Sequence, residues 1–191
     1  RKVFSVLPDS LEGLKPILLY PVIGLLLMGI LMTYVINPPT AAFNQWLAGA
    51  LAGMSTTSKI LLGFVLGGMM SIDFGGPLNK AAYVFGTASL AAADGSAVSS
   101  EIMAAVMIGG MVPPVAIALS TLLFSDKFTA KERQSGLTNF IMGLSFITEG
   151  AIPFAASDPL RVIPTCALGS AMAGALSMAF GCSVPAPHGG V

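Results

Sequence analysis

An uncharged run at residues 16–36 constrains the fold more than any other stretch of this chain. At about 1.5 Å per residue, a helix of this length covers roughly 30 Å, the thickness of the hydrocarbon core of a bilayer. Only 9% of all residues are charged, against roughly 25% in a soluble domain. Backbone groups inside a bilayer must find their hydrogen bonds within the protein. We therefore expect an all-α integral membrane protein of transmembrane helices.

The charges indicate topology rather than a charged partner. Nine basic and nine acidic residues cancel, so no net field would attract a nucleic acid. Basic residues gather at 1–15 and in the loop 125–135, and the positive-inside rule places both in the cytoplasm. An even number of crossings must then separate them. Spans at 16–36 and 102–124, with a hairpin that returns to its own side, meet this condition.

Two proline motifs and one pair of short apolar runs predict where helices break. Asn37-Pro38-Pro39-Thr40 is predicted to end the first helix, so that residues 41–58 lie near the membrane interface. The apolar runs 60–72 and 81–93 flank Gly75-Gly76-Pro77 and are short for a crossing, which favours a re-entrant hairpin. An aqueous loop between two short crossings is the alternative. Pro113-Pro114 predicts a kink or an unwound segment within 102–124.

Residues 145–161 carry the most informative polar groups of the chain. Pro153, Pro159 and Gly150 predict a broken helix there, and broken backbone at membrane depth survives only where it packs on protein or lines a cavity. An ionised Glu149 in this apolar segment needs a polar partner or a ligand, which makes it a candidate for a binding site. The apolar run that follows Arg161 is rich in Gly, Ala and Ser, which permit close helix packing.

Other polar residues allow both a structural and a functional interpretation. Asp73 and Lys80 could pair with each other or cap the helix break instead of binding a ligand. Asp158 and Arg161 are three residues apart, so they could form a structural ion pair, with Asp158 as the N-cap before Pro159. His188 is the single histidine. We interpret the two cysteines, Cys166 and Cys182, as packing residues, and their spacing predicts no metal site.

Four motifs in order resemble one protein family over nearly the whole chain. They are residues 71–83, 110–114, 146–164 and 186–190. Together they resemble the fructose-type enzyme IIC, the membrane subunit of the bacterial phosphoenolpyruvate-dependent sugar phosphotransferase system. Members are usually longer at the N-terminus, so residues 1–191 resemble the C-terminal part of the transmembrane domain, with sugar-binding hairpins expected at 60–93 and 137–161.

The resemblance implies a sugar site and a set of partners. In the wider superfamily a glutamate closes a Gly-Ile-Thr-Glu-like motif that binds sugar; Ile147-Thr148-Glu149 is similar, with Phe146 at the glycine position. It implies a homodimer in the bacterial inner membrane that binds fructose, or a related hexose or hexitol, and presents it to cytoplasmic IIA and IIB domains. Phosphorylated IIB would supply the phosphoryl group, so no cofactor is expected. The expected catalytic residues are Glu149 and His188, and the expected substrate-binding residues are Glu149, Thr148, Asn79, Asp73, Lys80, Asp158 and Arg161.

Two other functions use the same broken helices. In an ion-coupled secondary transporter, the carboxylates of Asp73, Glu149 and Asp158 could bind the coupling ion. A membrane receptor or scaffold could bind sugar without translocating it. Uptake driven by an ion gradient without phosphoenolpyruvate would favour the first, and binding without translocation would favour the second.

Overall fold

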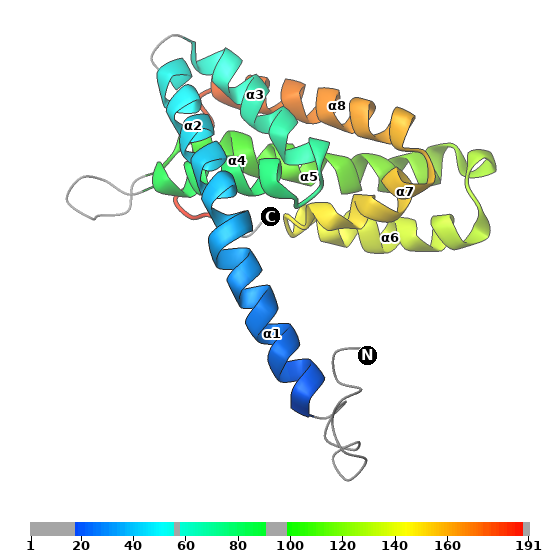
Figure 1. Ribbon diagram of the computed structural model, residues 1–191. Coiled ribbons are helices and arrows are strands. Elements are labelled where there is room, and N and C mark those ends of the chain that lie inside the picture. The colour runs from blue at the N-terminus through cyan, green and yellow to red at the C-terminus, as the bar shows by residue number, and fades with distance from the viewer. Residues whose placement is uncertain (1–17, 56–57, 91–98, 189–191) are drawn as a thin grey trace. The chain divides into compact units, whose positions relative to one another are not determined.

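The computed structural model describes residues 18–55, 58–90 and 99–188, and these residues form helices joined by short turns (Figure 1). The only pairing of extended backbone within these ranges is an isolated bridge between Ser100 and Val184. The predicted all-α fold is confirmed. The basic residues of 1–15, the end of the predicted arm 81–93 and Gly189-Gly190 lie outside the described residues. The chain divides into two units, residues 1–47 and 48–191.

Three of the described helical stretches have the length and apolar composition needed to cross a membrane. They are Tyr20–Leu51, Glu101–Leu123 and Pro159–Ala179. The first two overlap the spans predicted at 16–36 and 102–124. The third belongs to the run predicted after the central break. The helix Lys59–Ile72 is apolar but shorter, as expected for one arm of a hairpin.

One prediction is wrong in the first unit, because the motif at residues 37–40 does not end a helix. Helix α1 (Tyr20–Leu31) continues through a π-helical turn (Met32–Ile36) into α2 (Asn37–Ser55). Pro38 and Pro39 therefore fall in the first turn of α2, where a missing backbone N–H is tolerated. The hydroxyl of Thr40 donates to the carbonyls of Ile36 and Asn37, both at 2.9 Å.

The second unit contains both predicted breaks. Its first hairpin consists of α3 (Lys59–Ile72) and α4 (Pro77–Ala88), joined at residues 73–76. Helix α5 (Glu101–Leu123) follows, with a 3₁₀ turn (Ser125–Lys127) after it. The second broken segment consists of α6 (Ala130–Leu144), a 3₁₀ turn (Thr148–Ala151), α7 (Ile152–Ser157) and α8 (Pro159–Ala179).

Small residues let α3, α5 and α8 approach closely. A Cβ on Gly63 of α3 would lie 2.5 Å from the carbonyl oxygen of Gly174 on α8, and a Cβ on Gly109 of α5 would lie 2.7 Å from the Cα of Gly67. The hydroxyls of Ser71 and Ser170 are hydrogen-bonded at 2.5 Å between α3 and α8. Backbone contact of this kind is how helices associate inside a bilayer, where apolar burial drives association only weakly.

A kink or an unwound segment was predicted at the two prolines of α5. The helix remains continuous across both prolines, so the unwound segment is absent. A proline at position i removes the hydrogen bond to the carbonyl at i−4. Pro113 and Pro114 thus release the carbonyls of Gly109 and Gly110. The hydroxyl of Ser71 donates to Gly109 O at 3.1 Å, and the hydroxyl of Thr148 donates to Gly110 O at 3.0 Å. One released carbonyl anchors α3, and the other anchors the 3₁₀ turn of the second broken segment.

Candidate functional site

The first break is built by a carboxylate that caps a helix. After α3 ends at Ile72, Asp73 accepts hydrogen bonds from the backbone N–H groups of Leu78 (2.7 Å) and Asn79 (3.1 Å). Gly76 is required beside this cap, because a Cβ there would lie 2.6 Å from Asp73 Oδ2. The amide of Asn79, which is 3% exposed, donates to Met70 O at 2.7 Å. These hydrogen bonds fix where the first turn of α4 begins relative to the end of α3.

The second break turns on Phe146, whose φ is +61°. This left-handed conformation suits glycine better than a bulky residue, so Phe146 holds a glycine-like backbone at the position where the related motif has glycine. The N–H of Ile147 donates to Met142 O at 2.8 Å. Residues 146–148 pack closely against Gly110 of α5, since a Cβ on Gly110 would lie 2.5 Å from the ring of Phe146 and 3.0 Å from Thr148 Oγ1.

The two breaks meet at a cavity of about 260 Å³. A Cβ on Gly75, whose φ is +104°, would lie 2.6 Å from Glu149 Oε1, so only glycine admits the glutamate there. The Nζ atom of Lys80 lies 3.9 Å from the same oxygen. The cavity is lined by Met70, Asn79, Lys80, Tyr83, Phe146, Ile147, Thr148 and Glu149.

Four of the predicted site residues thus converge on one cavity, namely Asn79, Lys80, Thr148 and Glu149. Glu149 has the polar partner that its charge requires, since Lys80 lies beside it. The partner of Lys80 is Glu149 rather than Asp73, and Asp73 serves as a helix cap. Carboxylate, amide and hydroxyl groups on a small, partly apolar wall are the groups that bind sugar hydroxyls.

The other predicted site residues do not line this cavity. Arg161 Nη1 lies 3.4 Å from Asp158 Oδ2 at the start of α8, as expected for a structural ion pair. Asp158 occupies the N-cap position, but its side chain accepts no capping hydrogen bond, so its predicted capping role is wrong. His188 is exposed. Its neighbour Pro187 accepts a hydrogen bond from Tyr83 Oη at 3.3 Å, which ties the C-terminal segment to a residue of the cavity wall.

Tyr83 and Phe146 are cavity residues that the sequence did not single out as a site. Their ring centroids are 6.2 Å apart with an angle of 31° between the planes, within the range of favourable aromatic pairs. An aromatic wall beside polar groups suits the two faces of a sugar, one rich in C–H groups and one rich in hydroxyls. Tyr83 stands in the motif 71–83, but an aromatic residue in an apolar helix carries no signal of its own.

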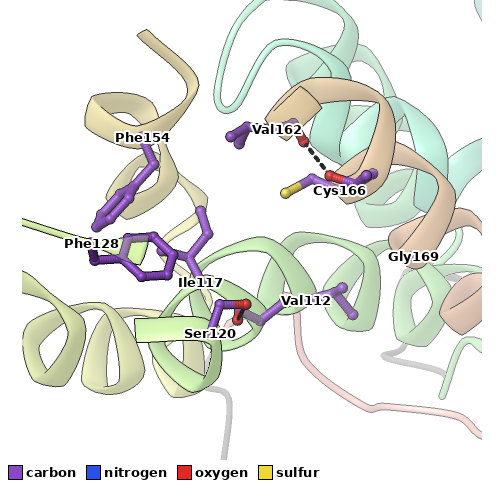
Figure 2. Close-up of a pocket in the computed structure, with 10 residues that line it drawn as sticks. Val112, Ile117, Ser120, Phe128, Phe154, Val162, Cys166 and Gly169 are labelled. Atoms are coloured by element: carbon purple, nitrogen blue, oxygen red, sulfur yellow. Dashed lines mark hydrogen bonds between the residues drawn. The ribbon is translucent and has the colours of Figure 1, made fainter. Parts of the chain in front are cut away.

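A second cavity, of about 290 Å³, lies between α5, α7 and α8 (Figure 2). Phe128 and Phe154 meet edge to face in its wall, with centroids 6.2 Å apart. The hydroxyls of Ser120 and Thr165 donate to carbonyls of their own helices. The wall is mostly apolar, and it has none of the charged or amide side chains that the cavity at the two breaks offers to a sugar. Cys166 is buried in this wall, as predicted for a packing residue, whereas Cys182 is exposed.

Comparison with known proteins decides the family. The family model described as "Phosphotransferase system, EIIC" matches residues 1–169. The chain belongs to this family. No significant match to a solved structure was found.

Curated relatives of this EIIC chain are fructose-specific components. The chain is 52% identical over 191 residues to the "PTS system fructose-specific EIIABC component" of Bacillus subtilis, covering 100% of this chain and 29% of that protein. It is 51% identical over 191 residues to the "Fructose permease IIC component" of Bacillus amyloliquefaciens, covering 100% of this chain and 61% of the relative. It is 48% identical over 185 residues to the "PTS system fructose-specific EIIB'BC component" of Escherichia coli, covering 97% of this chain and 32% of the relative. The chain therefore spans less than two thirds of the length of these relatives.

Proposed function

We propose that this chain forms part of the sugar-translocating subunit of a fructose phosphotransferase system. It binds fructose in the cavity between the two helix breaks, carries it across the bacterial inner membrane in a multi-pass homodimer and presents it for phosphorylation. The observation that carries the proposal is the convergence of Glu149, Lys80, Asn79 and Thr148 on one cavity, in a chain about half identical to fructose-specific relatives. The names of those relatives support fructose as the substrate.

The phosphoryl group comes from a phosphorylated IIB domain. The name EIIABC of one relative includes A and B components beside C, and the name EIIB'BC of another includes B components beside C. These names support IIA and IIB as cytoplasmic partners. One contribution of this chain to catalysis is orientation, because it holds a fructose hydroxyl in line with the arriving phosphoryl group. The carboxylate of Glu149 binds the sugar and accepts the proton of the reacting hydroxyl. His188 is a second candidate for this base.

The test is phosphoenolpyruvate-dependent phosphorylation of radiolabelled fructose by membranes that carry the complete protein, with the general phosphotransferase proteins added. The wild type should form fructose phosphate, and Glu149→Gln should not. Glu101→Gln is the matched control, because Glu101 pairs with Lys59 at 3.0 Å and does not line the cavity. Wild-type rates for Glu149→Gln would remove Glu149 from the site. Sugar uptake that follows an ion gradient and needs no phosphoenolpyruvate would replace the proposal with a secondary transporter.

A further inference from the structure

Hydrogen-bond donors are scarce in the cavity at the two helix breaks. The hydroxyl of Thr148 has one proton, which it donates to Gly110 O, and the hydroxyl of Tyr83 donates its proton to Pro187 O. One of the two amide protons of Asn79 is donated to Met70 O. These groups face a ligand chiefly as acceptors. They suit the hydroxyl protons of a sugar and do not suit an anion.

Lys80 is the cation in the wall of this cavity, and its donors remain available. Its Nζ lies 3.9 Å from Glu149 Oε1, beyond the roughly 2.7–3.2 Å of an N–H···O hydrogen bond. An ammonium group has three protons to donate. The side chain is 62% exposed, so a group that arrives from outside the cavity can reach it. The other described basic residues do not line this cavity: Lys59, Lys127, Lys131, Arg133 and Arg161.

The backbone at the start of α4 cannot replace Lys80. Helix N-termini bind phosphate through free N–H groups, but Asp73 accepts hydrogen bonds from Leu78 N and Asn79 N at this terminus. The carboxylate of Asp73 also places a negative charge where a phosphate would bind. Among the described groups that line this cavity, the one positive charge that can face an arriving phosphoryl group is therefore the Lys80 side chain.

We propose that Lys80 is a catalytic residue that stabilises the phosphoryl group during its transfer to the sugar. The inference rests on the proposed function. In the empty site Lys80 balances the charge of Glu149. When the sugar is bound, its hydroxyls occupy the Glu149 carboxylate and the ammonium group turns to the oxygens of the phosphoryl group. Charge on these oxygens is what a positioned cation stabilises during phosphoryl transfer.

The step is balanced without any further reactant. The bond between phosphorus and the donor atom of IIB breaks, and its electron pair stays with the donor atom. A new bond forms between phosphorus and the oxygen of the reacting fructose hydroxyl. The hydroxyl proton passes to the carboxylate of Glu149, and Lys80 keeps its own protons throughout. Glu149 and Lys80 then have separate roles, with Glu149 as the ligand and base for the sugar and Lys80 as the charge for the phosphoryl group.

The experiment separates binding from transfer in the complete protein. The variants are Lys80→Gln, which removes the charge at similar length, Lys80→Arg, which keeps it, and Glu149→Gln. The Kd for radiolabelled fructose is measured without a phosphoryl donor, and kcat is measured with phosphorylated IIB at saturating fructose. Because an exposed ion pair contributes about 0–1 kcal/mol, Lys80→Gln should change Kd by at most about fivefold. Loss of a positioned electrostatic donor should lower kcat by about 10²- to 10³-fold.

Lys80→Arg should recover most of the lost kcat, and Glu149→Gln should lose fructose binding. Fructose binding by Lys80→Gln also shows that the variant is folded. The inference is overturned if Lys80→Gln keeps a wild-type kcat, if Lys80→Arg is as slow as Lys80→Gln, or if Lys80→Gln loses fructose binding. If the wild type itself forms no fructose phosphate, the proposed function fails before any variant is compared.

Discussion

The two prolines of α5 lead to a prediction that a double-mutant cycle can test. Thr148 is 3% exposed, and its hydroxyl donates to Gly110 O, the carbonyl that Pro114 releases. Thr148→Val keeps the shape of the side chain and removes the donor. A buried carbonyl left without a donor costs about 1–3 kcal/mol. Thr148→Val should therefore lower the free energy of unfolding by roughly this amount.

Pro114→Ala should rescue much of this loss. Alanine restores a backbone N–H that can donate to Gly110 O within α5, so the carbonyl keeps a partner when Thr148 is replaced. In this background Thr148→Val should cost only about 0.5–1 kcal/mol, the net worth of an ordinary hydrogen bond. Pro114 is fully buried, and its removal leaves a void. The cost of that void is common to both arms of the cycle and cancels, which leaves a coupling energy of about 0.5–2 kcal/mol.

The assay is unfolding of the complete protein in mixed micelles by stepwise addition of dodecyl sulfate, followed by far-ultraviolet circular dichroism. Pro113→Ala is the matched control, because the carbonyl that it would satisfy is Gly109 O, which Ser71 already contacts. Thr148→Val should be as costly in the Pro113→Ala background as in the wild type. The reasoning is refuted if Thr148→Val costs the same in the Pro114→Ala background as in the wild type. That result would mean that the backbone N–H restored at position 114 does not replace the Thr148 hydroxyl as the donor to Gly110 O.

Three further predictions follow from close contacts and from one capped helix. Gly67→Ala should destabilise the protein by about 1–3 kcal/mol because the Cβ would strike the carbonyl of Ser170. Gly68→Ala is the control and should be neutral or slightly stabilising, because its Cβ would lie 3.5 Å from Ala171 Cβ. Equal unfolding midpoints for the two variants would contradict this. Gly75→Ala should weaken fructose binding by at least about tenfold because the Cβ would displace Glu149; an unchanged Kd would show that the contact is not required. Hydrogen bonds from the backbone N–H and the hydroxyl of Thr129 lower the pKa of Glu132. The stabilisation by Glu132 should therefore be complete above the ordinary glutamate pKa of about 4.3 and be lost as the pH falls through the lowered pKa of the folded state. A difference in unfolding midpoint between wild type and Glu132→Ala that does not shrink on acidification would argue against this cap.

The sequence predicts the helix breaks well where glycine and proline act locally. Gly75, Gly76 and Pro77 mark the first break, and Gly150 and Pro159 mark the second, because each limits the backbone at its own position. The same local reasoning was wrong at Pro38 and Pro39. A π-helical turn before them places both prolines in the first turn of the next helix, where they are tolerated. The hydrogen-bond register that decides this outcome is not visible in residue types.

Polar residues in this apolar chain identify four of the residues that line the cavity, but they also select residues outside it. Glu149, Lys80, Asn79 and Thr148 stand out in the sequence because a polar group in an apolar segment needs a partner, and they line one cavity. The same signal also selects Asp73, Asp158 and Arg161. The partner of Asp73 is the N-terminus of α4, and Asp158 and Arg161 pair with each other. It passes over Tyr83 and Phe146, because aromatic residues are ordinary in membrane helices. Residue type indicates that a partner is needed but does not identify the partner.

Residues 109–114 of α5 show how such partners are found over a long distance in sequence. Pro113 and Pro114 leave two carbonyls of α5 without their helical donors, and the donors that replace them come from Ser71 and Thr148. The glycines at 109 and 110 make room for these contacts, since a Cβ at either position would meet backbone or side-chain atoms within 3 Å. The two broken segments are thus fastened to adjacent carbonyls of one continuous helix. This arrangement explains why Glu149 and Lys80, 69 residues apart by their numbering, meet in one cavity: their positions are set by neighbouring residues of α5.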